Sequence, residues 1–221
     1  LEITIGILLI LLFTTLLVLF IYKEIKAWPV VSSMSTSRMK LGGIKKEPHV
    51  VGGVGLPVAL FLFTECMLFI GAFAMYFVLR SKFAVWPPID APHLDEMIPT
   101  VQTGVLILSS IMIEWAQSSV KKGNQLQMKI GCIGTTVLGA IFIILQFGVE
   151  WPHLLFDGIL TPEKSFFGAS FFILTGTHGV HVTGGVAALA VVSIRAMMGQ
   201  FSAKSHGFLE AVSMYWHFVL I

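Results

Sequence analysis

The run FGASFFILTGTHGVHVTGGVAALAVVSI, residues 167–194, extends over 28 positions without an Asp, Glu, Lys or Arg. A helix that crosses the hydrocarbon core of a bilayer needs about 20 predominantly apolar residues, at about 1.5 Å of rise per residue. This run therefore predicts a transmembrane helix. It also holds two histidines, His178 and His181, whose spacing of three places both imidazoles on one helix face.

The composition of the whole chain supports a membrane protein. Of its 221 residues 56% are hydrophobic and 12% are charged, and the mean hydropathy is +0.88, whereas soluble domains carry about 25% charged residues. Six stretches are long and apolar enough to span: 3–22, 56–79, 99–120, 128–149, 167–194 and 207–221. We predict an all-α, polytopic membrane bundle of six transmembrane helices. The basic loops lack interleaved aromatic residues, so nucleic acid is not an expected partner.

The apolar stretches divide the chain into three parts. Residues 1–22 are predicted to form an N-terminal transmembrane helix, because they lack the basic start and the small-residue cleavage site of a signal peptide. Residues 23–55 form a basic linker, and residues 56–221 a five-helix membrane domain. The chain starts without Met and ends inside an apolar run, so we expect the protein to be longer.

The charges of the loops predict the orientation. The linker 23–55 has six Lys or Arg against two Glu, and the loops 120–129 and 195–206 have basic residues without an acid. The alternate loops, 80–98 and 150–166, each hold three acidic residues and fewer basic ones. By the positive-inside rule, the first set faces the cytoplasm and the second faces outward.

Four ionisable groups lie far inside predicted helices. Glu65 lies about nine residues into its helix, and His178, His181 and His217 lie about ten to fourteen residues into theirs. A charge at mid-bilayer costs at least about 2.5–3.5 kcal/mol, so each group needs a partner or a function. Their similar depth predicts one shared interior cluster. Glu114, by contrast, precedes Lys121 by seven residues and is expected nearer the cytoplasmic interface.

Three interpretations of this cluster compete. In the first, the histidines and Glu65 ligate a metal or haem; di-metal bundles, however, use Glu-x-x-His pairs, which this cluster lacks. A proton relay through the same groups would need an exit and a driving element. In the third interpretation, protonated Glu65 and neutral histidines bond between helices or to lipid head groups. Gly176, Gly179, Gly184 and Gly185 favour this third one, since small residues let membrane helices approach closely.

Five motifs resemble subunit III of the haem–copper respiratory oxidases, in the order found in that family. They are FTECMLFIGAF with Glu65, VWPP, QFGVEWPHLL with Glu150, FFGASFFILTGTHGVHVTGG with His178 and His181, and EAVSMYWHFV with Trp216 and His217. VWPP and YWHFV favour the cytochrome c oxidase type. The quinol-oxidase form and the accessory subunit of nitric oxide reductase stay as alternatives, and a free-standing haem-binding bundle or transporter as one of another class.

The resemblance implies a chain without a catalytic residue, haem or copper of its own; these centres belong to partner subunits. It implies packing on subunit I, in a complex with subunit II, a phospholipid bound in a helix cleft, support of proton uptake, and a bacterial plasma membrane. Glu65 would be the buried carboxylate. The expected helix- or lipid-contact cluster comprises His178, His181, His217, Glu150, Trp216 and Arg195. Glu114 departs from the family, which tends to have a neutral residue there.

Overall fold

The computed structural model describes residues 55–88, 91, 94, 96–163 and 165–221. The predicted helix 1–22 and nearly all of the linker 23–55 lie outside these residues. The described elements are α2 (Gly55–Arg80), α3 (Met97–Lys121), α4 (Gln125–Leu145), the π-helical segment η1 (Gln146–Glu150), α5 (Trp151–Phe156), α6 (Phe166–Met197) and α7 (Gly207–Leu220). The prediction of an all-α architecture is confirmed.

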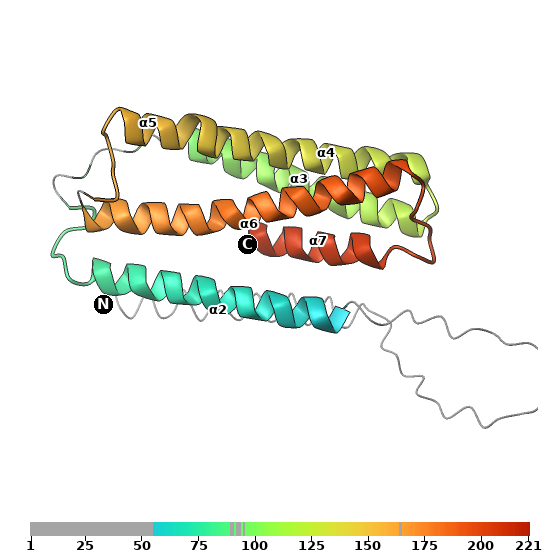
Figure 1. Cartoon of the computed structure of the whole chain (residues 1–221), viewed down its shortest axis with the longest axis horizontal. Coiled ribbons are helices and arrows are strands. Elements are labelled where there is room, and N and C mark those ends of the chain that lie inside the picture. The colour runs from blue at the N-terminus through green and yellow to red at the C-terminus, as the bar shows by residue number, and fades with distance from the viewer. Residues whose placement is uncertain (1–54, 89–90, 92–93, 95, 164) are drawn as a thin grey trace, which may run out of the picture.

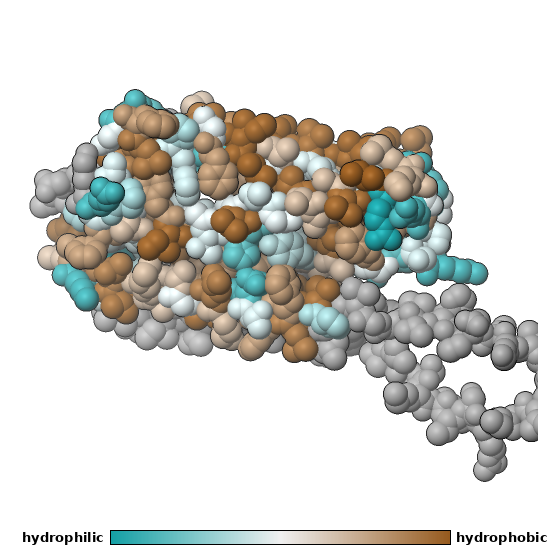
Figure 2. All heavy atoms as spheres, in the orientation of Figure 1, coloured by the Kyte–Doolittle hydropathy of each residue, from teal (hydrophilic) through white to brown (hydrophobic). Residues whose placement is uncertain are grey.

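Four of the described helical stretches are long and apolar enough to cross a membrane. They are Pro57–Arg80, Met97–Lys121, Gln125–Phe156 and Phe166–Met197. α7 has 14 residues and packs beside them. Many large apolar side chains point outward, as lipid-facing residues do, and on the face shown in Figure 2 hydrophobic residues cover most of the surface while hydrophilic ones gather mainly near the two ends.

The helices lie roughly parallel or antiparallel to one another in one elongated bundle (Figure 1). α4 packs against α3 and α6, and α7 fits between α3 and α6. α2 lies along one side of this group and contacts α6 and α7. The site described below forms at this α2–α6–α7 junction.

Glycines set how closely the central helices approach. A Cβ added at Gly131 on α4 would lie 2.7 Å from the Cβ of Ala116 and 2.9 Å from the carbonyl oxygen of Met112, both on α3. Trp216 of α7 is 2% exposed, and its ring would lie 2.8 Å from a Cβ at Gly139 or at Gly185. In hydrocarbon, where burial of apolar surface does not drive association, such close contacts hold helices together.

The helix that contains α4 runs further than the sequence indicates. We predicted 128–149 followed by a loop, whereas helical structure continues through η1 and α5 to Phe156. Pro152 lies in this extension. A proline ring clashes with the carbonyl four residues earlier in a regular α-helix, and the wider π turn immediately before it gives the backbone room to continue. Glu150 therefore lies in a helix, not in a loop.

Candidate functional site

The centre of the site is a contact between a carboxylate on α2 and an imidazole on α6. Oε2 of Glu65 lies 2.7 Å from Nε2 of His181, and the two side chains are 19% and 13% exposed. A carboxylate or an imidazole without a hydrogen-bond partner is costly to place among lipid tails. The contact between Glu65 and His181 gives each of the two groups such a partner. Midway along the face in Figure 2, a small hydrophilic area lies between α6 and α2.

The second nitrogen of His181 determines how protons are shared in this pair. Nδ1 lies 2.6 Å from the carbonyl oxygen of Thr177, and because a carbonyl only accepts, Nδ1 carries a hydrogen. Nε2 then either accepts from a protonated Glu65 or, as an imidazolium, donates to its carboxylate. Both arrangements leave the pair with no net charge, which is the condition that lets it lie within a membrane helix bundle.

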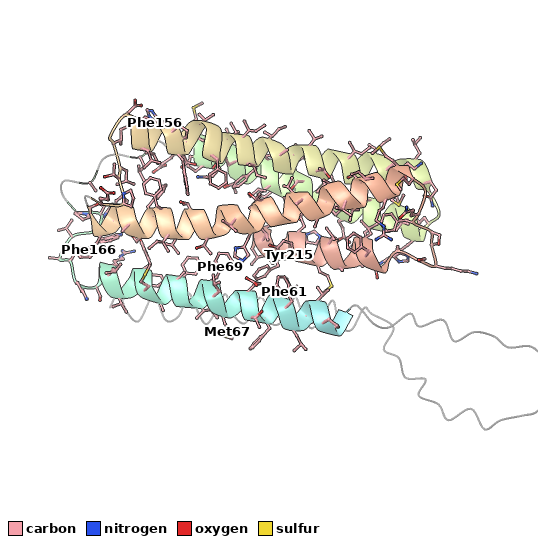
Figure 3. The ribbon with its side chains drawn as sticks, in the orientation of Figure 1. Phe61, Met67, Phe69, Phe156, Phe166 and Tyr215 are labelled. Carbon is pink, nitrogen blue, oxygen red and sulfur yellow. The ribbon has the colours of Figure 1, made fainter. Side chains whose placement is uncertain are left out.

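Aromatic side chains enclose the pair. The ring of Phe69 lies 4.9 Å from that of His181, centroid to centroid, and Phe218 of α7 contacts Phe69 at 6.1 Å. The hydroxyl of Tyr215 donates to the backbone carbonyl of His181 at 3.0 Å, and Phe61 stacks on Tyr215. In Figure 3, Phe61 and Phe69 point from α2 toward Tyr215, while Met67 points away. α2 is thus joined to α6 and α7 mainly around this partly buried pair.

A groove of about 170 Å³ opens beside the pair at the same three-helix junction. Its lining comes from α2, α6, α7 and the residue that follows α7: Phe69, Phe73, Leu174, His178, Phe218, Val219, Leu220 and Ile221. Of these eight side chains, His178 alone is ionisable, and its ring also packs edge-on against Phe142 of α4 at 5.8 Å. Phe69 contacts both the pair and the groove, so the two form one continuous site.

His217 lies on the side of α7 that faces α3, and it hydrogen-bonds to that helix. Its Nδ1 is 2.6 Å from the hydroxyl of Ser110, and its Nε2 is 3.5 Å from Oε2 of Glu114. Of the four groups predicted to share one cluster, the structure thus joins Glu65 to His181 and sets His178 beside them. The described contacts of His217 belong to the α3–α7 boundary.

The α3–α7 boundary is a ladder of polar contacts between antiparallel helices. The contacts run from the middle of the bundle to the end at which Lys121 lies, called the basic end below. Trp216 Nε1 donates to Ser109 Oγ at 3.0 Å, and His217 contacts Ser110 and Glu114. Nearer the basic end, Ser213 Oγ donates to Gln117 Oε1 at 3.3 Å, and Lys121 pairs with Glu210 at 3.1 Å. These α3 partners were not predicted from the sequence. Their signal was a row of Ser, Glu and Gln at helical spacing within the apolar run 99–120.

Comparison with known proteins identifies the family. The sequence profile described as cytochrome c oxidase subunit III matches residues 4–221. The chain belongs to the cytochrome c oxidase subunit III family. The resemblance inferred from the motifs is confirmed.

Relatives in this family come from bacteria and animals. The chain is 35% identical to cytochrome c oxidase subunit 3 of Synechocystis over 163 residues, which cover 73% of this chain and 68% of the relative. It is 35% identical to the probable subunit 3 of Mycobacterium leprae, with 75% and 81% covered, and 34% identical to the human subunit 3, with 78% and 66% covered. Together with its apolar helices, this membership makes the chain an integral membrane protein of an oxidase complex.

Two residues predicted for the contact cluster lie elsewhere in this subunit III chain. Glu150, in η1, lies near the side chains of Gln102 on α3 and Gln146. Arg195 lies near the end of α6, over the rings of Phe201 and Phe208 at 5.4 and 4.9 Å. Arg195 is 14 residues from His181 on the same helix, about 21 Å at helical rise, so it fastens the α6–α7 connection and takes no part in the Glu65 site.

The described residues offer no ready metal centre. Within residues 55–88, 91, 94, 96–163 and 165–221, no group of three or more His, Cys, Asp or Glu side chains is arranged to hold a metal ion. Cys66 and Cys132 are both buried and unbridged. What the geometry offers chemically is one shared proton between Glu65 and His181, and an apolar groove with one imidazole.

Proposed function

We propose that this chain is a subunit without redox centres of a respiratory haem–copper oxidase, of the cytochrome c oxidase type, in a bacterial plasma membrane. It packs on subunit I and takes a phospholipid chain into the groove at the α2–α6–α7 junction. By holding that lipid and its helices in place, it sustains proton uptake and protects the oxidase during turnover. The basic loops face the cytoplasm. Family membership supports the assignment to the oxidase.

The observation that carries the lipid role is the groove beside the Glu65–His181 pair. Seven of its eight lining side chains are apolar, which suits an acyl chain, and His178 offers a hydrogen bond to a polar group. The pair carries no net charge and holds its proton between two fixed groups. The pair is therefore better suited to a structural role than to taking up and releasing protons.

Filling the groove tests this function. Leu174 lines the groove, while its neighbour Ile173 is 48% exposed on the outside of α6. In the whole oxidase purified in mild detergent, we expect Leu174→Trp to lower the phospholipid retained per complex at least twofold and to hasten loss of activity during turnover. Ile173→Trp, the matched control, should leave both unchanged. Equal phospholipid in both variants would overturn the lipid role, and failure of the chain to co-purify with haem-bearing subunits would overturn the oxidase assignment.

A further inference from the structure

Glu114 has the most exposed side chain of the α3–α7 ladder, ahead of Lys121 at the end of α3, which is 52% exposed. The side chain of Glu114 is 69% exposed, while that of its partner His217 is 19% exposed. The contact between them is long, 3.5 Å from Nε2 to Oε2. A carboxylate has about four acceptor positions on its two oxygens, so most of the hydrogen-bonding capacity of Glu114 points away from the chain.

The depth of Glu114 makes this exposure costly. It precedes Lys121, the last residue of α3, by seven residues, or about 10 Å at 1.5 Å of rise per residue. Lys129, Arg195 and Glu210 lie within four residues of the ends of their helices, about 6 Å or less. Glu114 is therefore the deepest outward-facing acid at this end among the described residues.

The surface around Glu114 has the pattern of a helix-packing seam. Leu108, Ile111 and Trp115 are 50%, 62% and 40% exposed, and a Cβ added at Gly104 would meet nothing within 4 Å. The positions 104, 108, 111 and 115 repeat at spacings of four, three and four, which is the repeat that faces a partner helix in left-handed packing. The open glycine permits a close approach there.

We infer that this α3 seam, comprising Gly104, Leu108, Ile111, Glu114 and Trp115, binds a transmembrane helix of another subunit. That helix presents an Arg, Lys or His side chain, or another N–H donor, to the carboxylate of Glu114. The carboxylate then gains a second partner on its outward side, beyond its long contact with His217, at a position where an incompletely paired charge is expensive. This inference rests on the proposed membership of an oxidase complex, and it names the face and the chemistry of the contact.

Crosslinking in the native membrane tests the seam. Ile111→Cys and Leu108→Cys, each labelled with benzophenone maleimide in the assembled oxidase, should crosslink on illumination to a haem-bearing subunit identified by mass spectrometry. Val137→Cys on α4, 52% exposed and at a comparable distance from the basic end, is the matched control. Its yield should be at least fivefold lower. The native Cys66 and Cys132 are 3% and 0% exposed and give the background.

A second pair of variants tests the role of the acid. Glu114→Leu leaves the partner's donor without an acceptor, so the Ile111→Cys crosslink should fall at least threefold. Ser110→Ala removes only the internal bond to His217 and should leave that crosslink unchanged. Crosslinks confined to lipid, to residues 1–54 of this chain or to a second copy of it would overturn the inference. Equal crosslinking yields for Val137→Cys and Ile111→Cys would also overturn the inference. If the chain still co-purified with the complex in that case, the proposed function would stand.

Discussion

Glu65 and His181 are 116 residues apart in the sequence, and their side chains meet at 2.7 Å across the α2–α6 contact. Because Nδ1 of His181 is committed to the carbonyl of Thr177, the pair shares one proton at Nε2. An acid and an imidazole are thus present within a membrane bundle without a net charge. This relationship explains why α2, which packs loosely elsewhere, is fixed at this level of the bundle.

Substitution of Glu65 should separate a structural pair from a proton carrier. Glu65→Gln keeps a donor, since its amide N–H can reach Nε2 of His181, so assembly and initial oxygen consumption should be nearly unchanged. Glu65→Leu leaves Nε2 without a partner, which should lower the unfolding free energy of the subunit by about 1–3 kcal/mol. Met67→Leu, outward on the same helix (48% exposed), is the control. Outright loss of activity in Glu65→Gln, with metals intact, would identify a proton carrier.

Removal of the His178 imidazole should loosen the groove without touching the redox centres. His178→Ala is expected to lower phospholipid or subunit retention on detergent extraction at least twofold, because the groove loses its ionisable lining residue. The haem content of the freshly assembled complex should stay the same, as measured by reduced-minus-oxidised spectra. His153→Ala, with a side chain 55% exposed, is the matched control. A loss of haem in proportion to the mutation would contradict the structural role.

A methyl group at Gly131 should push α3 and α4 apart. Gly131→Ala places a Cβ 2.7 Å from the Cβ of Ala116 and 2.9 Å from the backbone oxygen of Met112. Neither of these atoms belongs to a flexible side chain that could move aside. We expect a destabilisation of about 1–3 kcal/mol, measured by denaturant titration in detergent. Gly71→Ala, where a Cβ meets nothing within 4 Å, should change stability by less than about 1 kcal/mol. Equal effects at both sites would refute close packing at Gly131.

A double-mutant cycle should measure one step of the α3–α7 ladder. Ser109→Ala removes the acceptor of Trp216 Nε1, and Trp216→Phe removes the donor. Hydrogen bonds between membrane helices average about 0.6 kcal/mol and reach about 1.7 kcal/mol, so the coupling free energy should fall in that range. The pair Ser213→Ala and Gln117→Ala offers a second cycle on the same boundary. If the stability changes of the single variants were additive in both cycles, the ladder would stabilise the boundary by packing and not by hydrogen bonds.

The class of the protein can be predicted from its sequence, because the class depends on composition and on the length of the apolar runs. Apolar runs of about 20 residues predict membrane helices wherever they occur, and the predicted stretches 56–79, 99–120 and 167–194 agree closely with α2, α3 and α6. The order of the five motifs identified the family. The prediction failed at 150–156, where a π turn carries the helix past Pro152, because a local pattern shows the proline but not the register that accommodates it.

The sequence by itself determined that ionisable groups at Glu65, His178, His181 and His217 would need partners, since hydrocarbon offers them none. Only the tertiary structure decided which partners they found. His178 and His181 share one face of α6, yet the rotation of α6 against α2 brings His181 to Glu65 and turns His178 toward the groove. The rotation of α7 likewise directs His217 to Ser110 and Glu114. Depth follows from position along a helix, whereas partnership follows from how neighbouring helices are rotated and packed.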